Sequence, residues 1–397
     1  MEFASLNRQI GSILLILGTE MGAGMLALPI VIVHVGVYVG TIILIIAWAI
    51  MLYTALLICE AISTTSEYVS FASMAEKSLG KWGKFFMTIV FWCTLSSIAI
   101  AYISAAGSTF NHMLSISTTL ASTIFVVLFG IFVILGTKTV DYINRIFLGL
   151  TLIAFFISIL MLFTGLKTVY LSTHGEYITI IYSFPVIITA FILHNLIPSI
   201  HTYLNYDKKV LRRVVIIGSL IPLVLYILWV TATIGNIPEH GPYGFDLLFA
   251  VGNKANVGAL LDLLSLNTHN NLIITSVNIV AIMTVISAFL GTSISLYHFI
   301  RDSFGHVRKN IVTHFVIPVI MTFIIPLFIV ITYPNIFIIA LSYAGVGATI
   351  LFVLIPIIIT KKLIKTGHVF SISILHNHFL LNLVFLIGLG VISIQMI

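Results

Sequence analysis

GTEMGAGMLALP, residues 18–29, interrupts the first long apolar run of the chain. Its Gly22-Ala23-Gly24 segment begins 13 residues past Gln9, which at 1.5 Å per residue is roughly 20 Å along a helix and near mid-membrane. Glycine weakens a helix, and hydrocarbon offers no partners for the backbone groups that a break releases. A small-residue packing face is the alternative; it explains the glycines but not Glu20, which is costly in a membrane. We therefore expect a broken helix here.

A second interruption is FILHNLIPS, Phe191 to Ser199. Pro198 has no N–H, so in a continuous helix it would remove the hydrogen bond to the carbonyl of His194. His194 and Asn195 add polar groups at the same depth. A proline kink with satisfied polar side chains is the simpler alternative, and a second broken helix is the functional one.

The composition is that of a membrane protein. Of the 397 residues 60% are hydrophobic and only 8% are charged, and the mean hydropathy is +1.20. A soluble domain has about 25% charged residues. About 20 apolar residues cross a bilayer, and on that measure the sequence predicts an all-α polytopic protein with eleven spans and an uncleaved first span. The spans start near residues 9, 37, 85, 120, 146, 177, 214, 272, 311, 336 and 374.

The basic residues predict the orientation. With a cytoplasmic N-terminus, sixteen of the eighteen Lys and Arg residues fall in inside loops, and only Lys167 and Lys254 fall outside. Such an excess is typical of cytoplasmic loops. The net charge of +6 is thus an orientation signal, and we expect no nucleic-acid partner. An odd number of spans places the C-terminus outside.

The two interruptions occupy corresponding places in two halves. They lie in the first and sixth spans, an offset of five, so the second half would enter the membrane with inverted topology, and interrupted segments at matching positions indicate a transporter's midplane site. We expect one transmembrane domain over 1–397, with inverted repeats of about 9–166 and 177–360 and an extra helix at about 374–396. Helix N-termini suit a carboxylate, and unwound carbonyls suit an ammonium group or a cation. An amino acid carries both charges.

At these residues the sequence resembles a known family. GTEMGAGMLALP and FILHNLIPS are similar to the first and sixth helices of the bacterial hydroxy and aromatic amino acid permeases. Ile286-Ser-Ala-Phe-Leu-Gly291 and Leu341-Ser-Tyr-Ala-Gly-Val346 resemble their eighth and tenth helices, and the likeness is closest to tyrosine-specific and tryptophan-specific permeases.

The resemblance implies a fold like that of the leucine transporter, with five-plus-five inverted repeats, broken helices 1 and 6 and one extra helix. It implies a multi-pass protein of the bacterial cytoplasmic (inner) membrane, lying in the lipid bilayer. The implied activity is import by alternating access of an aromatic amino acid, tyrosine first and then tryptophan or phenylalanine, by proton symport. A sodium-coupled carrier, or one selective for serine or threonine, is the alternative.

The resemblance also assigns candidate site residues. The carboxylate end of the substrate would lie at Gly22, Ala23, Gly24 and Met25, with Phe191, His194 and Asn195 across from them. Glu20 departs from the family, whose members are usually uncharged at this position. It is either a proton site or counter-charge for the substrate ammonium, or a protonated acid that caps backbone groups at the break.

Hydroxyl groups supply the remaining candidates. Tyr102 would face the cavity, and Ser287 and Thr292 would take part in ion coupling. The alternative for each is a hydrogen bond to its own helix backbone. Glu60 is a gate candidate, although an interfacial, solvated carboxylate is the simpler interpretation.

Other classes of protein have little support in the sequence. An ion channel would repeat a pore motif, and none is evident. An enzyme would need a nucleophile with a base, or a metal cluster, near one membrane face. We expect no catalytic residues, no metal and no cofactor. Two further short helices are predicted, at Tyr68 to Leu79 inside and Val257 to Leu266 outside.

Overall fold

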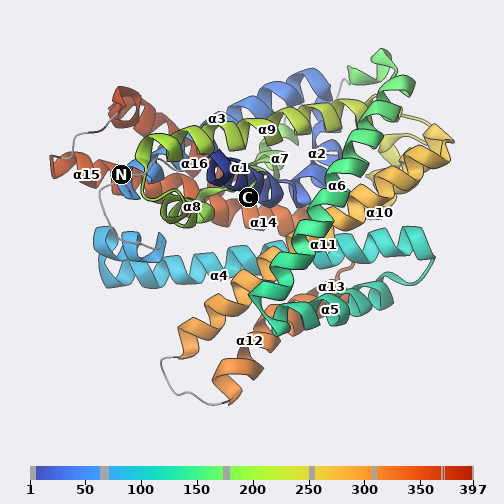
Figure 1. Ribbon diagram of the computed structural model, residues 1–397. Coiled ribbons are helices and arrows are strands. Elements are labelled where there is room, and N and C mark those ends of the chain that lie inside the picture. The colour runs from blue at the N-terminus through green and yellow to red at the C-terminus, as the bar shows by residue number, and fades with distance from the viewer. Residues whose placement is uncertain are drawn as a thin grey trace.

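The computed structural model describes residues 6–62, 71–172, 179–249, 255–305, 311–367, 370 and 372–395. Helices make up all of the regular secondary structure in this part of the chain (Figure 1). The α-helices are α1 (Leu6–Glu20), α2 (Ala23–Ile32), α3 (Gly36–Ile62), α4 (Phe71–Leu114), α5 (Thr118–Leu135), α6 (Thr137–Gly165), α7 (Thr179–Thr189), α8 (Ile197–Tyr203), α9 (Lys208–Ile234), α10 (Val257–Thr268), α11 (Asn271–Gly305), α12 (Ile317–Val319), α13 (Ile325–Thr332), α14 (Phe337–Ala348), α15 (Ile355–Lys365) and α16 (His378–Gln395).

Short 3₁₀ and π segments connect or continue these helices. The 3₁₀ turns are η1 (Val33–Val35), η2 (Thr168–Leu171), η3 (His194–Leu196), η4 (Phe245–Leu248) and η8 (Ser373–His376). The π turns are η5 (Val312–Val316), η6 (Ile320–Ile324) and η7 (Thr349–Leu354). Each π turn directly precedes α12, α13 or α15, and each of those helices has a proline in its first turn, where the missing N–H is tolerated.

Ten helical segments in the described part of the chain are long and apolar enough to cross a membrane, so the predicted polytopic helical fold is confirmed. The first of them, Gly24–Ile62, has 39 residues, about twice the length that one crossing needs. It contains α2 from Gly24 onward, then η1 and α3, and α3 begins at Gly36 with a φ of +76°. α1, with 15 residues, is below the length of a full span. The difference from the expected eleven spans therefore arises at the broken first helix.

One predicted short helix is confirmed in full, and the described part of the other is helical. Val257 to Leu266 lies within α10, which packs against α4 and α11. Of the segment Tyr68 to Leu79, residues 68–70 lie outside the described residues and the remainder forms the start of α4. Gly80, with a φ of +75°, interrupts the helical backbone of α4 at the end of this segment. The interruption separates it from the membrane span that follows.

The long helices pack in two groups. The first helix group consists of α1, α2, α3, α7, α8 and α9, and the second consists of α4, α5, α11, α12 and α13. α6 lies between them, against α11 and α9, and α14 lies against α4 and α7 (Figure 1). α16 packs on η7, α7 and α14. The interrupted helices α1–α2 and α7–α8 thus belong to one group and face the other.

Candidate functional site

The first break lies between α1 and α2. α1 ends at Glu20 and α2 begins at Ala23, so the predicted interruption is confirmed within a residue or two. The Gly22 N–H donates to the carbonyl of Glu20 at 2.6 Å, a tight turn in place of a helical bond. The first N–H groups of α2 have no partner within their own helix. The side chain of Ala23 lies outside the described residues.

The second break lies earlier than expected. α7 ends at Thr189, an irregular segment follows, and the chain turns helical again with η3 at His194. Pro198 lies in the first turn of α8, where a helix has no use for the missing N–H. The prediction that Pro198 removes a helical bond to His194 was therefore wrong. The proline begins a helix, and the interruption is at residues 190–193.

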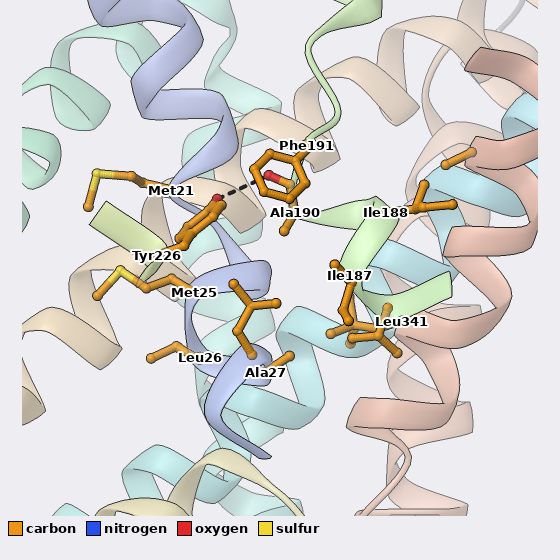
Figure 2. Packing of buried hydrophobic residues seen from close by; sticks show 14 of the residues in the cluster. Met21, Met25, Leu26, Ala27, Ile187, Ile188, Ala190, Phe191, Tyr226 and Leu341 are labelled. Atoms are coloured by element: carbon orange, nitrogen blue, oxygen red, sulfur yellow. Dashed lines mark hydrogen bonds between the residues drawn. The ribbon is translucent and has the colours of Figure 1, made fainter. Parts of the chain in front are cut away.

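The two breaks touch each other. A Cβ added at Gly24 would lie 2.5 Å from the Cβ and 2.7 Å from the Cα of Ala190, so only glycine allows the backbones this close. The hydroxyl of Tyr226, from α9, contacts the carbonyl oxygens of both Glu20 and Ala190, the latter at 3.0 Å. Figure 2 shows this side chain between the two interrupted helices, with its hydroxyl directed at Ala190. One buried phenol therefore connects both breaks.

Beside the breaks is a cavity of about 250 Å³, which we call the central cavity. Its walls come from single faces of α1, α4 and α11, since the lining positions on each recur at helical spacing. The rest of its wall comes from α6, η7, the end of α7, the second break and η3. Its lining residues are Leu15, Gly18, Thr19, Phe91, Thr94, Leu95, Ile98, Tyr102, Asn144, Thr189, Ile192, Asn195, Leu196, Ser287, Ala288, Gly291, Thr292, Ser295, Leu351 and Phe352.

Four of the candidate site residues line the central cavity: Tyr102, Asn195, Ser287 and Thr292. Asn144, on α6, also lines the cavity and was not among the predicted site residues; its side-chain oxygen accepts a hydrogen bond from the hydroxyl of Ser287. An asparagine within the apolar sequence of α6 could have indicated a site residue, because polar groups in membrane helices usually face the protein interior.

Other candidates lie in the packing around the breaks. Met25 and Phe191 are buried in the apolar core, and the Phe191 ring packs edge-on against Tyr226 with centroids 5.5 Å apart. A Cβ at Gly22 would lie 2.6 Å from the hydroxyl oxygen of Tyr102. Gly22 therefore connects the first break to the cavity wall.

His194 faces α3 rather than the central cavity. Its Nε2 is 2.9 Å from the hydroxyl of Thr54, and its ring stacks on Phe352 with centroids 5.1 Å apart. Phe352 lines the central cavity, whereas His194 does not and lies against the Phe352 ring. His194 is therefore a buried histidine hydrogen-bonded to another helix, as the alternative with satisfied polar side chains predicts.

Glu20 is the buried acid at the first break. Its side chain is 3% exposed, and neither carboxyl oxygen has a hydrogen-bond partner in the described part of the chain. An ionised carboxylate without a partner is strongly unfavourable in such surroundings. The buried acid thus lies at the point where the helix stops.

Glu60 differs from the simpler prediction. Its side chain is only 2% exposed, and its Oε2 lies 2.9 Å from Nη2 of Arg212. It is a buried partner in an ion pair between α3 and α9, and the interpretation as a solvated interfacial carboxylate was wrong. Within the described residues, no group of three or more His, Cys, Asp and Glu side chains is arranged to hold a metal ion.

Comparison with known proteins shows that the sequence matches a protein family along nearly its whole length. Residues 6–395 match the model of the tryptophan/tyrosine permease family. The chain is 31% identical to tyrosine-specific transport system 1 of Haemophilus influenzae, over 98% of this chain and 96% of that protein. It is 28% identical to the tryptophan-specific transport protein of the same organism, over 96% and 93%. It is 29% identical to glutamine transporter 2 of Aliivibrio fischeri, over 89% of each chain.

Proposed function

The chain belongs to the tryptophan/tyrosine permease family, and from that premise we propose that it imports an aromatic amino acid, tyrosine first, across the bacterial cytoplasmic membrane by proton symport. The observation that carries the proposal is the central cavity beside two helix breaks, lined by Phe91, Tyr102 and Phe352. Aromatic and aliphatic walls with a few polar groups are typical of small-molecule sites. The relatives named for tyrosine and tryptophan support the same substrate class.

In this proposal the breaks bind the part that all amino acids share. The N-terminus of α2, the positive end of its helix dipole, faces the substrate carboxylate, and the carbonyls of residues 191–193 accept from the substrate ammonium group. Tyr102, Asn195 and Ser287 complete the polar wall. The side chain of the substrate lies in the apolar part of the cavity.

Glu20 is the proposed proton site. It terminates α1 directly before the break, so a change in its charge acts on the backbone that would hold the carboxylate. A protonated Glu20 is neutral beside that carboxylate, whereas an ionised one repels it. Proton binding and substrate binding are thereby favourable together, which is the linkage that symport needs.

Alternating access is assigned to a rocking movement of the two helix groups. The first helix group carries both breaks, and the second forms the α4 and α11 faces of the cavity. Relative tilting of two packed bodies around a fixed midplane site is the general solution of transporters with inverted repeats. The N-terminus is cytoplasmic and the C-terminus external in this proposal, as the loop charges predict.

The test is uptake of radiolabelled tyrosine into proteoliposomes with an inward proton gradient. We expect accumulation that an uncoupler abolishes, that does not need sodium, and that tryptophan and phenylalanine inhibit more than glutamine or serine. Uptake that depends on sodium would overturn proton coupling and support the sodium-coupled alternative. Inhibition by glutamine or serine alone would overturn the aromatic assignment.

Glu20→Gln tests the coupling separately. The amide mimics the protonated acid, so we expect exchange of internal for external tyrosine to persist while gradient-driven accumulation is lost. Asp262→Asn, an exposed acid-to-amide change on α10 that keeps the Oδ1 acceptor facing Nδ1 of His112, is the matched control and should retain both activities. Accumulation that survives Glu20→Gln would remove Glu20 from the coupling mechanism.

A further inference from the structure

The glycines around the central cavity differ in what lies opposite their missing side chains. A Cβ at Gly18 would lie 3.1 Å from the Leu148 side chain, so this glycine serves helix packing. Gly291, on α11, also lines the cavity, and a Cβ there would meet no heavy atom within 4 Å. The missing side chain of Gly291 therefore leaves empty cavity volume.

The position of Gly291 relative to the first break is fixed by its neighbour on the same helix. The Cβ of Ala288 lies 3.3 Å from the Cβ position of Gly22. Gly291 follows three residues later, about 4.5 Å further along α11 at 1.5 Å per residue. It thus borders the cavity about one helical turn away from the break that would hold the substrate backbone.

The walls at this level suit a ring. Phe91, Leu95 and Ile98 present one apolar face of α4, and Phe352 closes the cavity from η7. The α11 face is built from small residues, so no large side chain from that helix enters the cavity. A flat side chain that enters between these walls would lie against the bare backbone at Gly291.

We propose that Gly291 sets the largest substrate side chain that the central cavity accepts, by leaving the space that an aromatic ring occupies. The inference rests on the proposed function, because it names a specificity residue of the same site. Its chemistry is steric: each carbon added at 291 takes volume from the substrate. One methylene too many in an apolar pocket changes kcat/KM by about 10- to 200-fold.

The experiment compares Gly291→Ala and Gly291→Leu with the wild-type protein in proteoliposomes, using radiolabelled tryptophan, tyrosine and phenylalanine. We expect Gly291→Ala to reduce kcat/KM for tryptophan by about tenfold and for the smaller rings by less. Gly291→Leu should abolish tryptophan uptake and reduce tyrosine uptake by about 100-fold. Equal losses for all three substrates, or no loss in either variant, would overturn the inference.

Gly149→Leu is the matched control. Gly149 is an exposed glycine of α6, a Cβ there also meets no heavy atom within 4 Å, and it does not line the cavity. Its uptake should equal that of the wild-type protein. If Gly291→Leu fails to fold, Gly291→Ala still decides, because its one methyl group enters open space.

The wild-type arm separates the two proposals. A wild-type protein that transports none of the three aromatic amino acids overturns the proposed function and this inference with it. Normal wild-type transport, with the substrate ranking unchanged in the Gly291 variants, overturns the inference alone.

Discussion

Replacing Tyr226 by phenylalanine tests whether the contact between the two breaks matters for transport. The side chain is fully buried, and its hydroxyl is shared between the carbonyl oxygens of Glu20 and Ala190. A phenol has one proton to donate, so one O–H group is shared by two acceptors, one from each interrupted helix. Phenylalanine keeps the ring and its packing against Phe191, and removes only this link.

The expected cost follows from the acceptors left behind. The carbonyl of Glu20 keeps the Gly22 N–H at 2.6 Å, whereas the carbonyl of Ala190 loses its 3.0 Å contact with the phenol. A buried acceptor without a partner costs about 1–3 kcal/mol. If that cost falls on the substrate-bound state, KM rises by about 5- to 150-fold, since 1.4 kcal/mol corresponds to a factor of ten.

The assay is tyrosine uptake as a function of concentration, with thermal unfolding of the same preparation. Tyr53→Phe is the matched control, because Tyr53 has a buried hydroxyl without a hydrogen-bond partner in the described part of the chain. We expect a raised KM for Tyr226→Phe and a wild-type KM for Tyr53→Phe. Identical KM and Tm in the two variants would refute the idea that Tyr226 holds the breaks together.

Three further predictions concern stability, each measured by thermal unfolding of the purified protein. Gly24→Ala forces a Cβ to within 2.5 Å of Ala190 and should destabilise the protein by at least about 1–3 kcal/mol; an unchanged Tm would contradict so close a contact. Arg212→Ala removes the cation that lies 2.9 Å from the buried Glu60 carboxylate and should cost up to about 3–5 kcal/mol, against no change if the pair were solvated. Asp207→Ala removes the cap that accepts two N–H groups of α9 at 3.0 Å and should cost about 1 kcal/mol, whereas Asp207→Asn should cost less.

The helical membrane architecture could be predicted because a bilayer requires long apolar segments whose backbone groups are hydrogen-bonded within the segment. Long apolar runs must become helices, so the spans, the short helix α10 and the first break could all be located from residue types. Glu20 followed two residues later by Gly22 at mid-span was sufficient to predict the first break, since no continuous apolar helix needs that combination.

The second break shows where such reasoning fails. Pro198 marks a helix interruption in most contexts, yet here it begins α8, and the break lies upstream at residues 190–193, which are apolar. Nothing in Ala190 to Leu193 indicates an irregular backbone. That segment is held by contacts from distant residues, Gly24 and Tyr226, so its conformation is a tertiary effect.

Side-chain direction was the other element that the sequence could not supply. His194 and Asn195 are adjacent, but Asn195 lines the central cavity and His194 bonds Thr54 on α3. Likewise Glu60 was assigned to solvent because it ends an apolar run, and it is buried against Arg212, 152 residues away. Which face a polar residue presents depends on the neighbouring helix, and a single sequence does not state which helix that is.

The division between breaks and cavity also explains why the motifs identify a family more readily than a substrate. In the proposed geometry the breaks bind the carboxylate and ammonium that every amino acid carries, so relatives named for tyrosine, tryptophan and glutamine can share them. Selectivity then depends on the faces of α4 and α11 that surround the side chain. On those faces one residue, such as Gly291, changes the volume without disturbing any backbone contact. Substrate preference should therefore change more easily than the transport mechanism in this family.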